Sequence, residues 1–306
     1  MATSRSFTPF LLLAFAGCSV PQVTYKGLGG DDSGGDDGGG GGDSNAAQCE
    51  KMDIVFVVDD SGSMSEEQTN LATNFPMFAN VLSSFKVNNG KPLDFRVAVT
   101  TTGRTVDYFT EVTGGTPIST HEDGDNGAFR NTCGVTERWL DRSDTMLSSH
   151  LACRANVGTT GPGIEMPLLM VKYALGDRVA DATNAGFLRS DALLAIVVIT
   201  DENDFSISTD GFTMTTDGSV PTNFNPPDLI DFLDTLKGDR SRWATAAIAA
   251  DGDCTSTFGD AKDATRLKSF VSQAGPQGAF SSICVGDLTV GLSDALDTFA
   301  AACGAR

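Results

Sequence analysis

Two uncharged apolar runs constrain the fold of this chain more than any other feature. Ile54–Val58 reads IVFVV, and Leu193–Thr200 reads LLAIVVIT. Short runs without charge are typical of strands that are buried on both faces, as in a parallel sheet. Strand-like segments alternate along the chain with segments of helical periodicity. The alternation predicts an α/β fold, a doubly wound and mostly parallel sheet with helices on both faces.

The remaining elements are predicted from the same two periodicities. The segment 103–156 does not fit the alternation because it is long, polar and contains a cysteine pair. We interpret it as an insertion, and long loops of this kind often carry function. Further strands are expected at Phe95–Thr100, Trp243–Ala250 and Ala279–Val285, and helices at Met64–Lys86, Met166–Ala174, Asp228–Leu236, Ala261–Ala274 and Leu288–Ala302.

Residues 1–17 have the composition of an export signal. Arg5 supplies positive charge and Pro9–Ala16 forms a short apolar core. The sequence Phe15-Ala16-Gly17-Cys18 resembles the lipobox of bacterial lipoproteins, although Phe15 replaces the usual Leu. The resemblance implies that Cys18 is lipidated. An ordinary cleaved signal peptide with an incidental cysteine is the alternative.

Residues 18–48 are dominated by Gly, Asp and Ser and bury too little apolar surface to fold. We interpret them as a flexible tether between the lipidated cysteine and a folded domain at 49–306. The expected location is the cell envelope, with the lipid as the only contact with a membrane. Ser19 stands where an Asp would resemble an inner-membrane retention signal, which favours the outer membrane or cell surface.

Six cysteines follow Cys18, and an even number in an exported chain predicts disulfides. Six cysteines allow fifteen pairings. One pair brackets the folded part, and domain termini often lie close together. A second pair brackets a polar segment, and the third follows two consecutive predicted strands. The hypothesis is therefore Cys49–Cys303, Cys133–Cys153 and Cys254–Cys284.

The net charge of −19, from 21 basic and 40 acidic residues, makes nucleic acid an unsuitable partner. Phosphate contacts require clusters of Lys and Arg, which this sequence lacks. A strongly acidic surface is compatible with solubility and with cation binding.

A cluster of small oxygen-bearing side chains follows the first apolar run. The sequence Asp59-Asp60-Ser61-Gly62-Ser63 is a D-x-S-x-S motif. Carboxylate and hydroxyl oxygens suit Mg²⁺ or Mn²⁺, with Ca²⁺ as an alternative, and do not suit zinc or copper. In an open α/β sheet, ligands bind outside the carboxyl ends of the strands. The motif therefore has cation-binding chemistry at a suitable place.

Two further segments complete a resemblance to the von Willebrand factor type A domain. They are 157–163, VGTTGPG, and 199–204, ITDEND, which follow the first motif in the order found in that family. The resemblance covers the whole folded part and implies a metal-ion-dependent adhesion site built from three loops. Thr160 is an alternative to Thr159 in the second loop. The implied metal residues are Asp59, Ser61, Ser63, Thr159 and Asp201.

The resemblance also implies a mode of action. Few charged ligands leave the cation electrophilic, so a carboxylate from a protein or glycan partner fills an open coordination position. Asp60 is expected to face solvent or the outer shell of the metal. Glu202 and Asp204 are expected to be solvated.

Other readings remain open at this point. The motif could be only a turn or a helix cap. Residues 121–127, HEDGDNG, are similar to part of a calcium loop, but the later Glu is replaced by Gly134. Catalysis is disfavoured because His121 and His150 are the only histidines, and no G-x-S-x-G or phosphate-loop motif occurs. An adhesion module is the leading hypothesis. An envelope scaffold with a stabilising metal and a metal-assisted hydrolase are the rivals.

Overall fold

The computed structural model describes residues 49–304, apart from 88–89 and 257–258. The expected signal, the lipidation site at Cys18 and the tether lie outside the described residues. Within the described part, no helix combines the length and apolar character that a membrane span needs.

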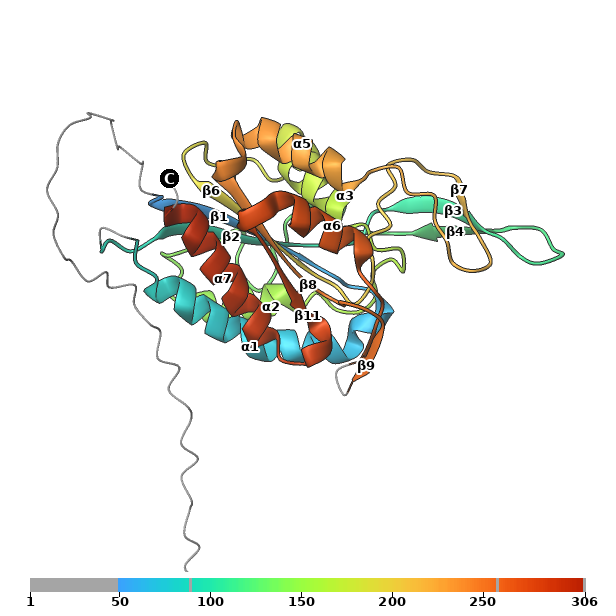
Figure 1. Cartoon of the computed structure of the whole chain (residues 1–306), viewed down its shortest axis with the longest axis horizontal. Coiled ribbons are helices and arrows are strands. Elements are labelled where there is room, and N and C mark those ends of the chain that lie inside the picture. The colour runs from blue at the N-terminus through green and yellow to red at the C-terminus, as the bar shows by residue number, and fades with distance from the viewer. Residues whose placement is uncertain (1–48, 88–89, 257–258, 305–306) are drawn as a thin grey trace, which may run out of the picture. The chain divides into compact units, whose positions relative to one another are not determined.

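A six-stranded sheet forms the centre of the domain (Figure 1). Every neighbouring pair of strands is parallel except the last, which is antiparallel. If the six strands of this sheet are numbered 1 to 6 in chain order, they lie across the sheet in the order 6-5-4-1-2-3, which is a doubly wound order. The predicted fold class is therefore confirmed. Across the sheet the strands are β11 (Gly278–Ser282), β8 (Trp243–Ala249), β6 (Leu193–Ile199), β1 (Lys51–Val58), β2 (Asp94–Thr101) and β5 (Leu140–Asp141).

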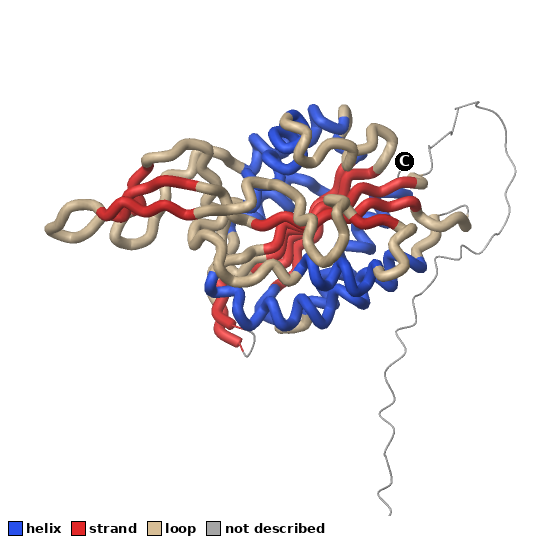
Figure 2. Tube along the Cα trace, turned by 180° about the vertical axis from the view of Figure 1, so that it is seen from behind, coloured by secondary structure: helices blue, strands red, loops and turns tan. Residues whose placement is uncertain are grey.

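Helices cover both faces of this sheet, as Figure 2 shows from behind. Ile54 and Phe56 of β1 belong to one apolar core, and Val55 and Val57 belong to the other. This division follows from the period of two along a strand. The first core packs against α1 (Ser65–Ser84), α2 (Leu147–Ala155) and α7 (Leu288–Gly304), and the second against α3 (Pro167–Lys172), α5 (Pro226–Lys237) and α6 (Thr265–Ala274).

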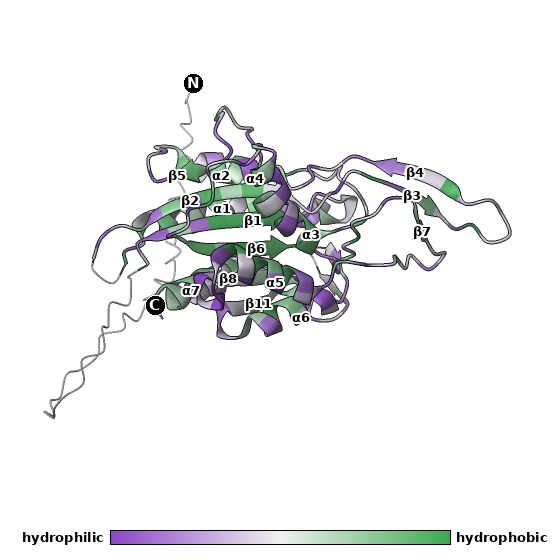
Figure 3. Cartoon of the chain, turned by 90° about the horizontal axis from the view of Figure 1, so that it is seen from above, coloured by the Kyte–Doolittle hydropathy of each residue, from purple (hydrophilic) through white to green (hydrophobic). Residues whose placement is uncertain are grey.

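Aromatic packing fixes the position of α1 on the sheet. The ring of Phe56 meets those of Phe75 and Phe78 edge to face, with centroid separations of 4.9 and 5.1 Å. All three side chains are buried. Aromatic pairs of this geometry contribute about 0.5–1.5 kcal/mol beyond the burial of their area. The strong apolar character of the central strands is visible in Figure 3.

Two helices differ from their predicted bounds by more than two residues at one end. The helix predicted at Met166–Ala174 continues beyond α3 through a π-helical turn (Tyr173–Asp177) into the short α4 (Arg178–Ala180). The helix predicted from Ala261 begins only at Thr265. The residues before it form β10 (Gly259–Ala261), which pairs with β9 (Cys254–Ser256) in a hairpin.

The expected insertion at 103–156 divides into two parts. Its first part contributes β3 (Val106–Thr110) and β4 (Ile118–Glu122), which join β7 (Phe212–Met214) in a separate three-stranded sheet. Figures 1 and 3 show this sheet as an arm that projects from the domain. The second part returns to the domain, where β5 pairs with β2 and α2 packs against α1. The sequence did not predict the arm, in which β3 and β4 form a local hairpin and β3 also pairs with the distant β7.

Three disulfides join Cys49 to Cys303, Cys133 to Cys153, and Cys254 to Cys284. These are the pairings expected from the sequence. The first brings the two ends of the folded domain together. The second links the loop before β5 to α2, and the third ties the β9–β10 hairpin to the turn after β11.

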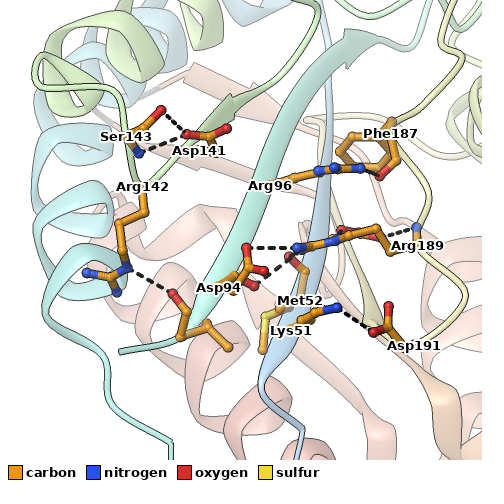
Figure 4. A network of polar contacts seen from close by, with 12 residues as sticks. Lys51, Met52, Asp94, Arg96, Asp141, Arg142, Ser143, Phe187, Arg189 and Asp191 are labelled. Atoms are coloured by element: carbon orange, nitrogen blue, oxygen red, sulfur yellow. Dashed lines mark hydrogen bonds and ion pairs between the residues drawn. The ribbon is translucent and has the colours of Figure 1, made fainter. Parts of the chain in front are cut away.

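A buried ion pair lies near the amino end of β1, and Figure 4 labels its arginine, Arg189, beside Asp94. Asp53 is fully buried, and its carboxylate accepts hydrogen bonds from the Arg189 backbone N–H at 2.7 Å and from Arg189 Nε at 2.8 Å. The same guanidinium pairs with Asp94 at 2.8 Å. Burial raises the pKa of Asp53 and the contacts with Arg189 oppose that rise. This end of the sheet is therefore electrostatically compensated.

Candidate metal centre

The first motif and Asp201 lie at the point where the strand order reverses. The chain runs from β1 outward to β2, and later from β6 outward to β8 on the other side. The crevice at the carboxyl ends of two such strands is the usual ligand site of an open α/β sheet. Asp59 directly follows β1, and its N–H donates to the carbonyl of Ile199, the last residue of β6, at 2.9 Å. The fold thus supplies a reason for the two loops to meet.

Asp59 holds the neighbouring loops together. It is fully buried, and its Oδ1 accepts from the Ser61 N–H at 2.8 Å while its Oδ2 accepts from the Thr200 hydroxyl at 2.5 Å. The Gln68 side chain donates to its carbonyl at 2.9 Å. Burial raises the pKa of Asp59, and the bonds from Thr200 and Ser61 act against that rise. Because protein donors already bond both carboxylate oxygens, Asp59 is suited to hold the neighbouring loops in place.

The two motif serines are hydrogen-bonded to each other. Their hydroxyl oxygens lie 2.9 Å apart. Neither the short 3₁₀ turn Gly62–Met64 nor α1 has a hydrogen bond from a capping side chain at its start. The helix-cap interpretation of the motif is therefore wrong, and the hydroxyls of Ser61 and Ser63 remain available as oxygen donors.

Asp201 carries the clearest sign of a missing partner. Its exposed fraction is 0%, and neither carboxylate oxygen has a hydrogen-bond partner within the described structure. Burial, followed by the charge of Asp59, raises the pKa of Asp201 to about 8, and the nearby Ser63 hydroxyl lowers it. An uncompensated buried carboxylate is costly unless it gains a proton or a cation. Hard oxygens around an orphaned carboxylate fit a divalent cation.

The second loop reaches the site through Gly161. Its N–H donates to the carbonyl of Asp60 at 2.7 Å. A Cβ at this position would lie 2.2 Å from Asp60 Cγ, so only glycine permits this approach. Thr159 is half-buried and Thr160 is exposed. Neither hydroxyl is hydrogen-bonded to the motif residues in the described structure, so the role of Thr159 stays a prediction.

Asp60 does not face solvent, contrary to one of the two expectations. It is 9% exposed and its Oδ1 has no hydrogen-bond partner among the described residues. Burial, followed by the charges of Asp125 and Asp59, raises its pKa to about 7, while Arg130 lowers it. The close packing of Gly161 accounts for the burial.

The expectation that Asp204 is solvated is wrong. Its carboxylate is fully buried and accepts from the Leu168 N–H at 3.0 Å and from Arg266 Nε at 3.0 Å. It also accepts from the Ser206 hydroxyl at 2.6 Å. Asp204 therefore fixes the start of α3 and is fully partnered. Glu202 is half-buried.

Two buried glutamates near the site were not predicted. Glu165 is 1% exposed and lies beside Asp59 and Glu202, and burial raises its pKa well above the usual value. Glu67 is 3% exposed, and burial, followed by the charge of Glu66, raises its pKa to about 7. A signal for Glu165 was present, because it is the only charged residue between 157 and 171.

The site depends on hydroxyls. No three acidic, histidine or cysteine side chains in the described part of the chain are grouped so that they could enclose a metal. A cation here would rely on the serine hydroxyls, Asp201 and water. A cavity of about 480 Å³ opens beside it, lined by Gly62, Ser63, Ser65, Glu66, Ser256, Gly259 and Asp260.

Several polar groups of the loop at 121–127 are hydrogen-bonded to neighbouring residues. The Asn126 side chain accepts from the Thr105 N–H at 2.9 Å and donates to the Thr105 hydroxyl at 2.8 Å. His121 bonds Asp107 on the neighbouring strand at 2.8 Å. These contacts lie at the base of the arm, and a cation site in this loop stays a prediction. The other histidine, His150, bonds Asp144 at 2.7 Å beside α2.

No protein-family model and no curated protein sequence matches this chain. Among solved structures, proximal thread matrix protein 1 of the mussel byssus aligns with 83% of this chain and 49% of its own length, at 13% identity and a TM-score of 0.44. The pilus adhesin SpaC of Lactobacillus rhamnosus GG aligns over 81% and 30%, at 11% identity and 0.43. Manganese-loaded TRAP of Plasmodium vivax aligns over 79% and 71%, at 12% identity and 0.35. The chain spans about half the length of the mussel protein. At these scores the likenesses carry no argument, and the fold and site stand on the geometry above.

Proposed function

We propose that this chain is an exported adhesion module that binds an acidic group of a protein or glycan through a divalent cation. The supporting observation is Asp201, whose two buried oxygens lack partners beside the paired hydroxyls of Ser61 and Ser63. Mg²⁺ or Mn²⁺ suits such a donor set, and Ca²⁺ is the alternative.

The residues of this site have different roles. Ser61, Ser63 and Asp201 would hold the cation, and Thr159 is the candidate from the second loop. Asp59 orients the Ser61 backbone and the Thr200 hydroxyl, and so keeps the loops after β1 and β6 in register. The cation supplies a positive charge that a partner's carboxylate can approach. Because hydroxyls neutralise no charge, that attraction is preserved.

The location of the module is part of the same proposal. The lipobox-like segment would place a lipid on Cys18, and residues 18–48 would tether the domain at the envelope surface. Three disulfides in the domain support an oxidising compartment.

Metal titration tests the core of the proposal. Isothermal calorimetry with Mg²⁺ and with Mn²⁺ should show binding to the wild-type protein and a strong loss of binding to Asp201→Asn. Asp191→Asn is the matched control, because this exposed aspartate pairs with Lys51 at the opposite end of the sheet (Figure 4). The absence of binding by the wild type, or equal binding by Asp201→Asn, would sink the proposal.

A second measurement separates adhesion from a scaffold whose metal only stabilises the fold. Surface binding to a carboxylate-bearing matrix should be reversed by a chelator under conditions where the domain stays folded. If chelation lowers the melting temperature and leaves surface binding unchanged, the scaffold explanation is correct.

A further inference from the structure

Glu165, like Asp201, differs from the buried acids Asp53 and Asp204. Asp53 is paired with Arg189 and Asp204 with Arg266, at 2.8 and 3.0 Å. Both carboxylate oxygens of Glu165 lack a hydrogen-bond partner in the described structure, although the residue is only 1% exposed. A carboxylate is not retained in such a place without a compensating charge or proton. No positively charged side chain of the described structure pairs with Glu165, and burial, the charge of Asp59 and the interaction with the Glu202 carboxyl raise its pKa, so either a proton or a cation must compensate its charge.

The backbone around Glu165 is pinned between the loops that form the candidate site. Its carbonyl accepts from the Phe205 N–H at 2.8 Å, in the segment that follows β6. The next residue, Met166, donates from its N–H to the carbonyl of Thr102, after β2, at 3.1 Å. Glu165 is thus held on both sides of the carboxyl end of β1, where Asp59 lies. Its position is set by the fold and does not depend on a flexible surface loop.

The charges that face Glu165 are negative. The carboxylate of Asp59 is the nearest in effect and that of Glu202 comes next. Besides burial, the charges of Asp59 and Glu202 also raise the pKa of Asp201. Two carboxylates without hydrogen-bond partners, those of Glu165 and Asp201, therefore both interact with Asp59. A cation bound by Asp201 and the serine hydroxyls would attract the Glu165 side chain.

We propose that Glu165 is a built-in carboxylate that competes with an acidic partner for the bound cation. This inference rests on the proposed function. No three acidic side chains of the described structure are grouped so that they could enclose a metal. Glu165 would therefore reach the cation by a change of its own side-chain rotamer. Without a partner it would compensate the cation's charge and occupy the position open to ligands. An acidic partner would have to displace it, which sets a threshold for adhesion.

Glu165→Gln removes the charge with little change of shape. The proposal predicts two opposite effects: weaker metal binding, by about 10-fold or more as for other carboxylates that support a metal site, and tighter binding of a carboxylate probe. Glu67→Gln is the matched control. It removes another buried carboxylate that acts on Asp59, from the first turn of α1. If general electrostatics alone were responsible, both variants would behave alike.

The water-proton relaxation of protein-bound Mn²⁺ gives a direct readout, since it increases with the number of exchangeable waters on the metal. The full-length protein, loaded with Mn²⁺, is titrated with acetate. Glu165→Gln should show higher relaxivity per bound Mn²⁺ than the wild type, and acetate should reduce it at lower concentration. Glu67→Gln should match the wild type in both respects.

The outcomes separate this inference from the proposed function. If the wild type binds no Mn²⁺, the proposed function fails and the inference fails with it. If the wild type binds Mn²⁺ and Asp201→Asn does not, but Glu165→Gln has wild-type relaxivity and acetate response, only the inference is overturned. Should Glu165→Gln not fold, Glu165→Asp provides the same test, because a side chain shorter by one methylene should also free the metal position. Wild-type relaxivity in Glu165→Asp would then overturn the inference.

Discussion

Replacing Asp201 by asparagine should stabilise the metal-free protein while it removes metal binding. The substitution keeps the shape of the side chain and deletes a buried negative charge that has no partner. Most substitutions of buried polar residues destabilise a protein, so a gain in stability would be a specific signature. It would show that Asp201 destabilises the metal-free folded protein, as expected of a residue whose role is to bind a ligand.

The magnitude follows from the pKa of Asp201, which rises from 3.8 to about 8 on folding. A carboxyl group with a higher pKa in the folded state holds its proton longer there, so this group's contribution to stability falls as the pH rises between these values. Each tenfold difference in proton affinity corresponds to about 1.4 kcal/mol. Relative to low pH, the raised pKa of Asp201 therefore lowers the free energy of unfolding by about 2 kcal/mol at pH 5 and by about 5 kcal/mol at pH 8. The latter is an upper limit for the gain, because the amide of Asn also needs partners.

Urea unfolding, followed by the fluorescence of the buried Trp243, measures this difference. With a chelator present, Asp201→Asn should exceed the wild type in free energy of unfolding, and the gap should widen by about 3 kcal/mol from pH 5 to pH 8. With saturating Mn²⁺ the gap should shrink or reverse, since only the wild type gains binding energy. A metal-free variant that is less stable than the wild type at pH 8 would refute the reasoning.

Three other predictions follow from the same geometry. Mn²⁺ at 100 times its dissociation constant should raise the wild-type free energy of unfolding by about 2.7 kcal/mol, and a chelator should remove this gain in differential scanning calorimetry. Arg189→Met should cost about 3–5 kcal/mol in urea unfolding because it leaves Asp53 buried and unpaired, whereas Lys51→Met should cost less than about 1 kcal/mol; equal costs would contradict the assigned burial. Gly161→Ala should weaken Mn²⁺ binding in calorimetry because its Cβ would lie 2.2 Å from Asp60 Cγ, and unchanged affinity would show that the second loop is not needed.

Much of the fold could be read from periodicity. The strands β1 and β6 are uncharged and buried on both faces, and this pattern alone predicted a parallel sheet. The arm was missed: its β3–β4 hairpin lies in the segment interpreted as an insertion, and the pairing of β3 with β7, about a hundred residues away, leaves no local signal. The start of α6 was misplaced for a related reason, since β10 is defined by its hairpin partner.

The candidate site was predictable in its chemistry and only partly in its composition. The D-x-S-x-S spacing identified oxygen donors, because residue type decides which atoms can meet a cation. The roles of Asp204 and Glu165 were not predictable. Arg266 reaches Asp204, whereas no positively charged side chain of the described structure pairs with Glu165. Partnering depends on side chains brought from distant segments.

The sequence by itself determined the fold class, the six cysteines that form the disulfides and the presence of hard oxygen donors after a buried strand. These properties depend on local residue order and composition. Only the tertiary structure decided which donors meet. It placed Asp59 and Asp201 at the reversal of strand order, engaged both oxygens of Asp59, and left those of Asp201 without a partner. The physical reason is that the electrostatic state of a buried carboxylate is set by its neighbours in space, and those neighbours come from separate segments of the chain.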